Sequence, residues 1–368
     1  MDSQKLLFSF LKESVFGVIS SEIAKEEEGK ALFLLSKKHD LAHLVPYSKI
    51  LGPARESFQR EEILAMVRRD KSDFALSEIT RVLKEENIEY LPLKGAVIAD
   101  LYPKRYMRTS GDIDVLVREE DLERAVKALC EKLGYESDGK RQYHDVSLFS
   151  KSKVNLELHF NILENSENID RLLSRVWEHV ENGRMENEFL IFHIVAHASY
   201  HFLHGGCGIK PLLDLKLLLE KLDFDEEKLK EYLRETELEK FYETLLSLIA
   251  VWFEDGERTP LTDAVEAFIL EGGVGGNKEN SIAVQKEKNG GRFGFLFARV
   301  FLPYDSMTRY YPILKKYKIF LPFMYIVRMT RLFSPKVFRR SFSTLKKSGE
   351  IGEEKANEVK NLLKEIGL

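Results

Sequence analysis

Hydrophobic residues in the first part of the chain recur at steps of three and four, which is the period of an amphipathic helix. Leu6 and Phe10 belong to one such series, and a second extends over residues 63–82. The Gly-Pro pair within Leu51–Pro53 separates the two series. Residues 1–87 are therefore predicted to form a helical region.

A different pattern follows, in which hydrophobic and polar positions alternate over short runs, as they do in strands. Four strands are predicted, over Ile88–Leu93, Asp112–Val117, Tyr143–Phe149 and Lys153–Phe160, and two helical segments, over Ala96–Leu101 and Asp121–Leu133. The last two strands are expected to form a hairpin around Ser150–Ser152. Residues 88–165 thus form a small mixed sheet with helices. The predicted fold class is α+β (mixed α/β), with this sheet embedded in a mainly helical chain.

The remaining residues divide into three regions by the same criteria. Residues 166–255 show helical spacing again, whereas residues 256–291 contain the run Gly-Gly-Val-Gly-Gly and are predicted to be a flexible loop or lid. Residues 292–368 are expected to form short helices, because prolines interrupt a basic and aromatic sequence. An amphipathic helix is predicted over residues 350–366.

The composition is that of a folded globular protein, since 44% of the 368 residues are hydrophobic and 32% are charged. The two cysteines, Cys130 and Cys207, cannot build a disulfide framework or a CxxC metal site, so a reducing, cytoplasmic setting is expected. The longest apolar run, Ile319–Val327, has nine residues and contains Pro322, whereas a membrane-spanning helix needs about 20. No transmembrane segment is predicted.

The net charge of −4 is unevenly distributed. Residues 292–347 contain thirteen Lys or Arg and one acid, Asp305, which gives +12 and leaves −16 on the rest of the chain. Such a segment, with Phe and Tyr between its basic residues, can bind nucleic acid, lie on an anionic membrane surface, or pack its aromatic side chains into the protein. Nucleic acid is therefore a candidate partner through residues 292–347.

Two carboxylates stand on one face of the strand predicted over Asp112–Val117. Because strand side chains alternate, Asp112 and Asp114 point together, away from the hydrophobic residues of the same strand. Such a pair repels unless a divalent cation or several N–H donors lie between its members, and Mg²⁺ prefers oxygen ligands. Glu157, flanked by leucines on a later strand, is the candidate for a third acidic ligand. Asn155 shares that strand face, but only Glu157 is an acid.

The segment before this strand has the features of a phosphate-binding turn. Lys94 and Gly95 stand where a strand meets a helix, so that the glycine lets a phosphate approach the backbone and the lysine adds a full positive charge. Arg108 and Ser110, just before the acidic strand, can also reach triphosphate oxygens. These four residues are candidate nucleotide-binding residues.

Lys210 and Asp214 follow a glycine-rich turn and are two further candidate nucleotide-binding residues. The alternative is a structural ion pair near the start of a helix. The sequence does not favour one over the other.

Four histidines, His193, His197, His201 and His204, are spaced for one face of a helix. A pair of them at i and i+4 can bind zinc. No HExxH motif is present, and the favoured interpretation is a polar helix face that lines a cleft or contacts another domain.

The order of these motifs resembles that of the DNA-polymerase-β-like nucleotidyltransferase superfamily, in which a glycine turn precedes an acid–hydrophobic–acid strand and a later strand supplies a third acid. It resembles more closely the bacterial family of uncharacterised nucleotidyltransferases (the NTP_transf_5 type), whose members have Lys-Gly in the turn and an arginine four residues before an Asp-Ile-Asp strand. Here these elements are Lys94-Gly95, Arg108 and the run DIDVLV. The likeness extends over most of the chain.

The resemblance implies that Asp112 and Asp114 are metal ligands, that Glu157 is the third catalytic carboxylate, and that Lys94-Gly95 forms the phosphate-binding turn. It also implies Mg²⁺, with Mn²⁺ as the alternative metal, and transfer of a nucleoside monophosphate from a nucleoside triphosphate to a hydroxyl group on a protein, an RNA or a small molecule. The sequence departs from the superfamily pattern at Ala96, where serine is usual, and in a longer spacing between the turn and the acidic strand.

Two other functions are compatible with the sequence. A nucleotide-binding or antitoxin-like interaction protein can use the same fold with weak or no catalysis, although the intact Asp112, Asp114 and Glu157 argue against a complete loss of catalysis. A metal-dependent phosphohydrolase can instead use the histidines. Its zinc content would distinguish it from a Mg²⁺-dependent transferase that releases pyrophosphate.

Overall fold

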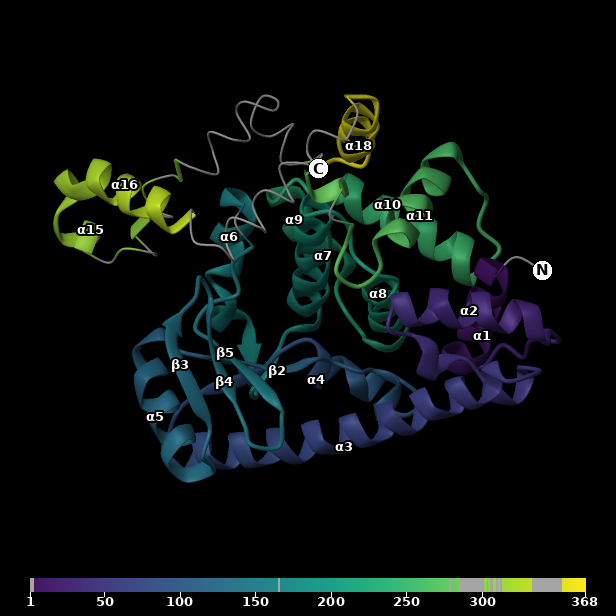
Figure 1. Cartoon of the computed structure of the whole chain (residues 1–368), viewed down its shortest axis with the longest axis horizontal. Coiled ribbons are helices and arrows are strands. Elements are labelled where there is room, and N and C mark those ends of the chain that lie inside the picture. Colours follow the sequence, from purple (N-terminus) through teal and green to yellow (C-terminus); the bar gives the residue numbers. More distant parts are fainter. Residues whose placement is uncertain are drawn as a thin grey trace. The chain divides into compact units, whose positions relative to one another are not determined.

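The sheet predicted in residues 88–165 is present, and its five strands lie within a mainly helical chain, which confirms the α+β class (Figure 1). The computed structural model describes residues 3–164, 166–277, 279–282, 284, 301–302, 304, 307–308, 311, 313–332 and 353–368. The chain forms two compact units, the first made of Met1–Tyr200 and Gly208–Asp263 and the second of His201–Cys207 and Ala264–Leu368. The predicted boundaries at residues 87 and 165 fall within the first unit.

The five strands have the spatial order β1-β2-β5-β4-β3. Their bounds are Tyr90–Pro92 for β1, Asp112–Val117 for β2, Glu136–Arg141 for β3, Asp145–Phe149 for β4 and Asn155–His159 for β5. β2 and β5 run parallel, and the other neighbouring pairs are antiparallel. The hairpin predicted around Ser150–Ser152 is confirmed as β4 and β5, whereas β3 is absent from the sequence-based prediction.

One face of the sheet packs against two helices, α3 (Ala54–Glu85) and α5 (Leu122–Leu133). Ile113, Val115 and Val117 of β2 are buried in this core, as the alternation of the strand predicts. In Figure 1, α3 runs beneath the sheet and extends well beyond it. The polar face of β2 is therefore the one that these two helices leave uncovered.

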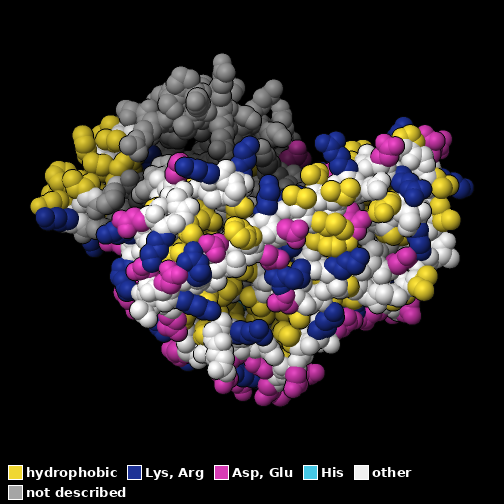
Figure 2. Space-filling model, turned by 90° about the horizontal axis from the view of Figure 1, so that it is seen from below, with side chains coloured by type: hydrophobic (Ala, Val, Ile, Leu, Met, Phe, Trp, Pro, Cys, Tyr) yellow, Lys and Arg dark blue, Asp and Glu magenta, His cyan; other side chains and the backbone are white. Residues whose placement is uncertain are grey.

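The outer side of α3 remains at the protein surface. Ile63, Val67 and Phe74 are exposed there. Figure 2, which views the molecule from below, shows acidic and basic side chains spread between such hydrophobic ones. α3 thus supports the sheet from one side without being enclosed.

The other helices up to residue 253 precede and follow the sheet. Those before it are α1 (Ser3–Phe16), α2 (Glu26–Lys38) and the 3₁₀ turns η1 (Ala42–Leu44) and η2 (Tyr47–Lys49). Between and after the strands come α4 (Gly95–Ile98), η3 (Ala99–Leu101), η4 (Arg105–Met107), η5 (Glu119–Asp121), α6 (Glu167–Leu173), η6 (Val176–His179), α7 (Asn187–Leu203), α8 (Lys210–Lys221), α9 (Glu226–Glu235) and α10 (Glu239–Phe253). A short hairpin, β6 (Val180–Glu181) and β7 (Arg184–Met185), interrupts the segment predicted to be helical.

The prediction of a loop over residues 256–291 is wrong in part. Pro260–Gly272 forms helix α11, in which the buried Val265, Phe268 and Ile269 follow helical spacing. The prediction of a loop rests on the glycines at the end of this helix and overlooks the helical spacing of its hydrophobic residues. Residues 285–291 lie outside the described part of the chain.

The remaining described helices belong to the second unit. They are α15 (Ile313–Lys316), η7 (Lys318–Phe320), α16 (Leu321–Leu332) and α18 (Glu353–Glu365). α18 confirms the predicted amphipathic helix and buries Val359 and Leu363. Much of the basic segment 292–347 is outside the described residues. Where the structure describes the chain, no helix has both the length and the apolar character needed to cross a membrane.

Candidate acidic active site

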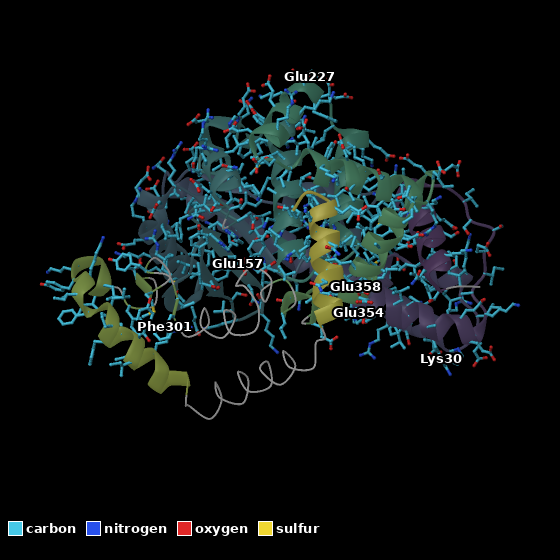
Figure 3. The ribbon with its side chains drawn as sticks, turned by 90° about the horizontal axis from the view of Figure 1, so that it is seen from above. Lys30, Glu157, Glu227, Phe301, Glu354 and Glu358 are labelled. Carbon is cyan, nitrogen blue, oxygen red and sulfur yellow. The ribbon has the colours of Figure 1, made fainter. Side chains whose placement is uncertain are left out.

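The two aspartates of β2 face an acid on the neighbouring parallel strand. Asp114 is directly opposite Glu157 in the register of β2 and β5, and Asp112 is opposite Asn155. These side chains lie on the sheet face that α3 and α5 leave uncovered, because the residues between them are buried on the other face. Figure 3, which looks at the molecule from above, shows Glu157. The three predicted acids are thus brought together on one face of the sheet.

The three acids concentrate negative charge. Burial raises the pKa of Asp112 to about 6, and the carboxylates of Asp114 and Glu157 add to the rise. Burial also opposes ionisation of Asp114, but a hydrogen bond from His159 and the charge of Lys94 hold the pKa of Asp114 well below its ordinary value. Asp114 is therefore stabilised as an anion, whereas the negative charge around Asp112 is of the kind that a bound divalent cation would offset.

His159 also lies on this face and is absent from the sequence-based prediction. Its Nε2 is 3.0 Å from Oδ1 of Asp114 and 3.6 Å from Oε2 of Glu157. Burial disfavours the charged ring, but the two carboxylates raise the pKa of His159 to about 9, so the ring donates to Asp114 as a cation. His159 follows Glu157 by two residues, and the alternation that places Glu157 on this face places His159 there too.

The turn between β1 and α4 has an unusual backbone. Lys94 has a φ of +38°, a value that residues with a Cβ seldom adopt. Gly95 is closely packed, since a Cβ there would lie 3.2 Å from Oγ of Ser110. Arg69 of α3 donates from Nη1 to the carbonyl oxygen of Gly95 at 3.2 Å. The turn is therefore fixed between α3 and the loop that precedes β2.

The side chain of Lys94 extends to α7. Its Nζ lies 3.2 and 3.4 Å from the two ring nitrogens of His197. Nδ1 of His197 is in turn 2.7 Å from Oε1 of Glu164. Because the charge of Lys94 also lowers the pKa of Asp114, the ammonium group lies close to both α7 and the acidic face.

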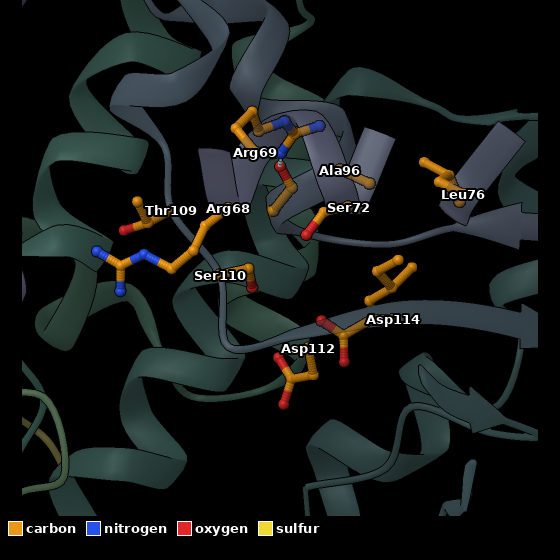
Figure 4. A pocket seen from close by; sticks show the side chains of 11 residues that line it. Arg68, Arg69, Ser72, Leu76, Ala96, Thr109, Ser110, Asp112 and Asp114 are labelled. Atoms are coloured by element: carbon orange, nitrogen blue, oxygen red, sulfur yellow. Dashed lines mark hydrogen bonds between the residues drawn. The ribbon is translucent and has the colours of Figure 1, made fainter. Parts of the chain in front are cut away.

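A pocket opens beside the two aspartates (Figure 4). Its lining comes from α3, from the Lys94-Gly95 turn with the start of α4, and from β2 with the loop before it. The lining residues are Arg68, Arg69, Ser72, Leu76, Gly95, Ala96, Thr109, Ser110, Asp112, Ile113 and Asp114. Four predicted site residues, namely the glycine, the serine and the two aspartates, thus share one pocket. The α3 residues Arg68, Arg69 and Ser72 are absent from the prediction, because nothing in the local sequence links that helix to the acids.

Three other predicted residues lie in a buried network of ion pairs. Nε and Nη2 of Arg108 donate to the carboxylate of Asp214 at 2.8–2.9 Å, and the hydroxyl of Tyr102 donates to the same group at 2.8 Å. Lys210 donates from Nζ to Oδ2 of Asp40 at 2.7 Å. The charged groups of Arg108, Lys210 and Asp214 are therefore engaged within the protein, where they join α8 to the segments before β2.

The four predicted histidines have different surroundings. His193 is fully buried, and His197 contacts Lys94 and Glu164. His201 and His204 belong to the second unit. Among the described residues, the one group with the spacing of metal ligands is Asp114, Glu157 and His159.

The acidic face offers the donors that Mg²⁺ prefers. Ligand atoms of Asp114, Glu157 and His159 lie within 4.8 Å of one another, and Asp112 shares their face. Nδ1 of His159 has no partner within the described part of the chain, whereas a metal-bound histidine usually donates a hydrogen bond from its second nitrogen. The carboxylates are thus the better ligands, and they fit a cation that prefers oxygen.

Residues 29–254 match the model of one protein family, which is described as uncharacterised nucleotidyltransferase. The chain belongs to this family. The matched residues include all five strands of the main sheet, the Lys94-Gly95 turn, the acidic face and α7. Nucleotidyl transfer in general is therefore the activity that the family assigns to this chain.

Two solved structures are similar to parts of the chain. The antibiotic-resistance factor ANT(2'')-Ia is 14% identical, with coverage of 45% of this chain and 90% of its own, and a TM-score of 0.34. The Thermotoga maritima CCA-adding enzyme, in complex with tRNA, is 12% identical, with coverage of 84% of this chain and 82% of its own, and a TM-score of 0.20. Both TM-scores are below 0.5, so family membership rests on the sequence match. A search of curated protein sequences gives no match.

Proposed function

We propose that this protein transfers a nucleoside monophosphate from a nucleoside triphosphate to a hydroxyl group and releases pyrophosphate. The observation that carries the proposal is the position of Asp114 opposite Glu157, with Asp112 on the same face. The Lys94-Gly95 turn is close to both aspartates, since Gly95 shares their pocket and the charge of Lys94 acts on each of them. Acids that hold a cation and a turn that holds phosphates are the groups that this reaction needs.

Asp112, Asp114 and Glu157 would hold Mg²⁺, or Mn²⁺ in its place. When bound, the cation offsets charge on the triphosphate and lowers the pKa of the acceptor hydroxyl. His159 would keep Asp114 ionised and oriented through the hydrogen bond between them.

The chain's own residues would bind and orient the substrates. The ammonium group of Lys94 and the hydroxyl of Ser110 would donate to triphosphate oxygens, and Gly95 has no side chain to obstruct them. The acceptor oxygen attacks the α-phosphorus, the bond to the bridging oxygen of the β-phosphate breaks, and pyrophosphate leaves with that oxygen. Glu157 would take the proton of the acceptor hydroxyl.

Arg108, Lys210 and Asp214 stay proposed nucleotide contacts. In the structure Arg108 pairs with Asp214, Lys210 pairs with Asp40, and Arg108 stands two residues before Ser110. A nucleotide contact by any of these three residues would require its present ion pair to open.

The acceptor class stays open between a protein, an RNA and a small molecule. Within the described part of the basic segment, Tyr317, Phe320 and Phe323 are exposed close in sequence to the exposed Lys316 and Lys318. Aromatic rings can stack on bases, and ammonium groups can pair with phosphates. Nucleic acid therefore remains a candidate partner of residues 292–347.

The proposal is tested by incubating the protein and Mg²⁺ with each nucleoside triphosphate labelled at the α-phosphate, together with RNA, protein and small-molecule acceptors. We expect the label to move to an acceptor and pyrophosphate to be released in equal amount, and Asp112→Asn to abolish both. Release of inorganic phosphate without pyrophosphate would instead indicate the phosphohydrolase. Binding of a nucleotide with no transfer to any acceptor would favour the interaction protein.

A further inference from the structure

Lys94 is the non-glycine residue of the candidate site whose backbone is held in an unfavourable conformation, with φ of +38° and ψ of −107°. Such conformations persist where surrounding contacts maintain them, and they occur often at functional sites. Contacts with two neighbouring segments hold the backbone of this turn: the N–H of Leu93 donates to the carbonyl of Asp114 at 3.0 Å, and the side chain of Arg69 donates to the carbonyl of Gly95 at 3.2 Å. The backbone on each side of Lys94 is therefore fixed. These contacts also fix the direction of the Cα–Cβ bond of Lys94.

The other end of the Lys94 side chain is held by a residue more than 100 positions later in the sequence. That residue is His197, whose ring lies within hydrogen-bonding distance of the ammonium group. Nδ1 of His197 is 2.7 Å from Oε1 of Glu164, and Nζ of Lys94 lies 3.2 Å from the same Nδ1 and 3.4 Å from Nε2. Glu164 thus anchors the imidazole ring against which the ammonium group of Lys94 lies.

The surroundings support this arrangement. The side chain of Glu164 is 8% exposed and that of His197 is 26% exposed, so the pair is sheltered but can still be reached by a ligand at Lys94. His193, one helical turn before His197, is fully buried. His197 therefore stands on a part of α7 that is packed into the protein.

The geometry points to His197 and Glu164 as positioning residues that hold the ammonium group of Lys94 ready for the phosphate chain of the substrate. This inference rests on the proposed function, and it assigns a role to two residues that are not among the proposed metal ligands. A free lysine side chain has several rotatable bonds whose freedom is lost when it binds a phosphate. A lysine that is already held loses less, so it binds phosphate more tightly.

The test uses inorganic tripolyphosphate with Mg²⁺ as the probe, because every nucleoside triphosphate contains this chain of phosphates and the base preference is not needed. Calorimetry would give its Kd for the full-length protein and for Lys94→Ala, His197→Ala and the double variant. We expect His197→Ala to weaken binding about tenfold when Lys94 is present. In the Lys94→Ala background the same change should have no further effect, because His197 then has nothing to position.

Two further variants separate positioning from general support of the fold. His197→Gln keeps an amide oxygen for Lys94 and an amide N–H for Glu164, so it should restore part of the lost affinity. His179→Ala is the matched control, since His179 forms the same type of pair with Glu186, at 3.0 Å, away from the acidic face. It should leave the Kd for tripolyphosphate unchanged.

The outcomes are distinguishable. The positioning role is overturned if His197→Ala weakens tripolyphosphate binding equally with and without Lys94. It is also overturned if Lys94→Ala weakens binding and His197→Ala does not. Both results leave the proposed function intact. Absence of Mg²⁺-dependent binding of both tripolyphosphate and nucleoside triphosphates by the unsubstituted protein overturns the proposed function, and the inference with it.

Discussion

Arg108 donates hydrogen bonds to both carboxylate oxygens of Asp214, a residue 106 positions later in the chain. Both side chains are largely buried, and Tyr102 donates to the same carboxylate. The pair joins α8 to the segment that leads into the acidic strand. The position of Asp112 and Asp114 therefore depends on a contact with a helix that follows the sheet in sequence.

Replacement of Asp214 by Asn should destabilise the protein strongly. The change leaves the guanidinium group of Arg108 buried without its counter-charge, and breaking such a pair costs about 3–5 kcal/mol of unfolding free energy. Denaturant-induced unfolding would measure this loss. Glu89→Gln is the control, because its ion pair with Arg118 is exposed and should contribute less than about 1 kcal/mol. Equal, small effects of both changes would contradict the structural role of the buried pair.

Gly95→Ala should loosen the phosphate-binding turn. The new methyl group would approach Oγ of Ser110 to 3.2 Å and its Cβ to 3.3 Å, which is too close without movement of one of the two segments. Overpacking of this kind costs about 1–3 kcal/mol, and the shift should weaken binding of the nucleoside triphosphate. Thermal unfolding of Gly95→Ala and of Gly95→Ala combined with Ser110→Gly would check the cause. Stability should return in the double variant, and a double variant as unstable as the single one would show that Ser110 is not the obstacle.

The stability of the protein should fall as the pH drops below about 6.5, in part because of His43. Burial lowers the pKa of His43 to about 4, and the positive charge of Lys210 adds to this, whereas the hydrogen bond to the carbonyl oxygen of Met107 opposes it. A histidine whose pKa is lower in the folded state contributes its full stability above the pKa of the unfolded chain, near 6.5, and loses it as the pH falls toward 4.

The loss due to His43 between pH 7 and pH 5 should be about 2 kcal/mol. Urea unfolding at the two pH values, for the unsubstituted protein and for His43→Gln, would isolate this contribution. The variant should show a pH dependence that is smaller by that amount. An unchanged pH dependence in His43→Gln would mean that His43 does not titrate in this range on unfolding.

The sheet could be predicted from local sequence where the strands alternate. β2 has the predicted bounds because Ile113, Val115 and Val117 are buried on one face while the acids occupy the other. β3 could not be found in this way, because its sequence Glu-Ser-Asp-Gly-Lys-Arg contains no hydrophobic residue, and its pairing with β4 defines it as a strand. Helix α11 is absent from the sequence-based prediction because the glycines that follow it indicate a loop, although its apolar residues have helical spacing.

The candidate site could be predicted only in part from the sequence. Alternation alone places Asp112 and Asp114 together, but the pairing of Asp114 with Glu157 also requires that β5 lies parallel to β2, which depends on the order of strands in the sheet. His159 could have been found from its position two residues after Glu157. The contacts of Lys94 with His197, and of Gly95 with Arg69, join distant segments and have no local signal.

Calorimetric titration with each nucleoside triphosphate in the presence of Mg²⁺ tests the central claim most directly, with Asp112→Asn/Asp114→Asn as the comparison. The account predicts that the unsubstituted protein binds at least one nucleoside triphosphate, that removal of Mg²⁺ by a chelator abolishes binding, and that the double variant does not bind although it is folded. Binding by the double variant with unchanged affinity, or no binding of any nucleoside triphosphate by the unsubstituted protein, would contradict the assignment of this acidic face as a nucleotidyl-transfer site.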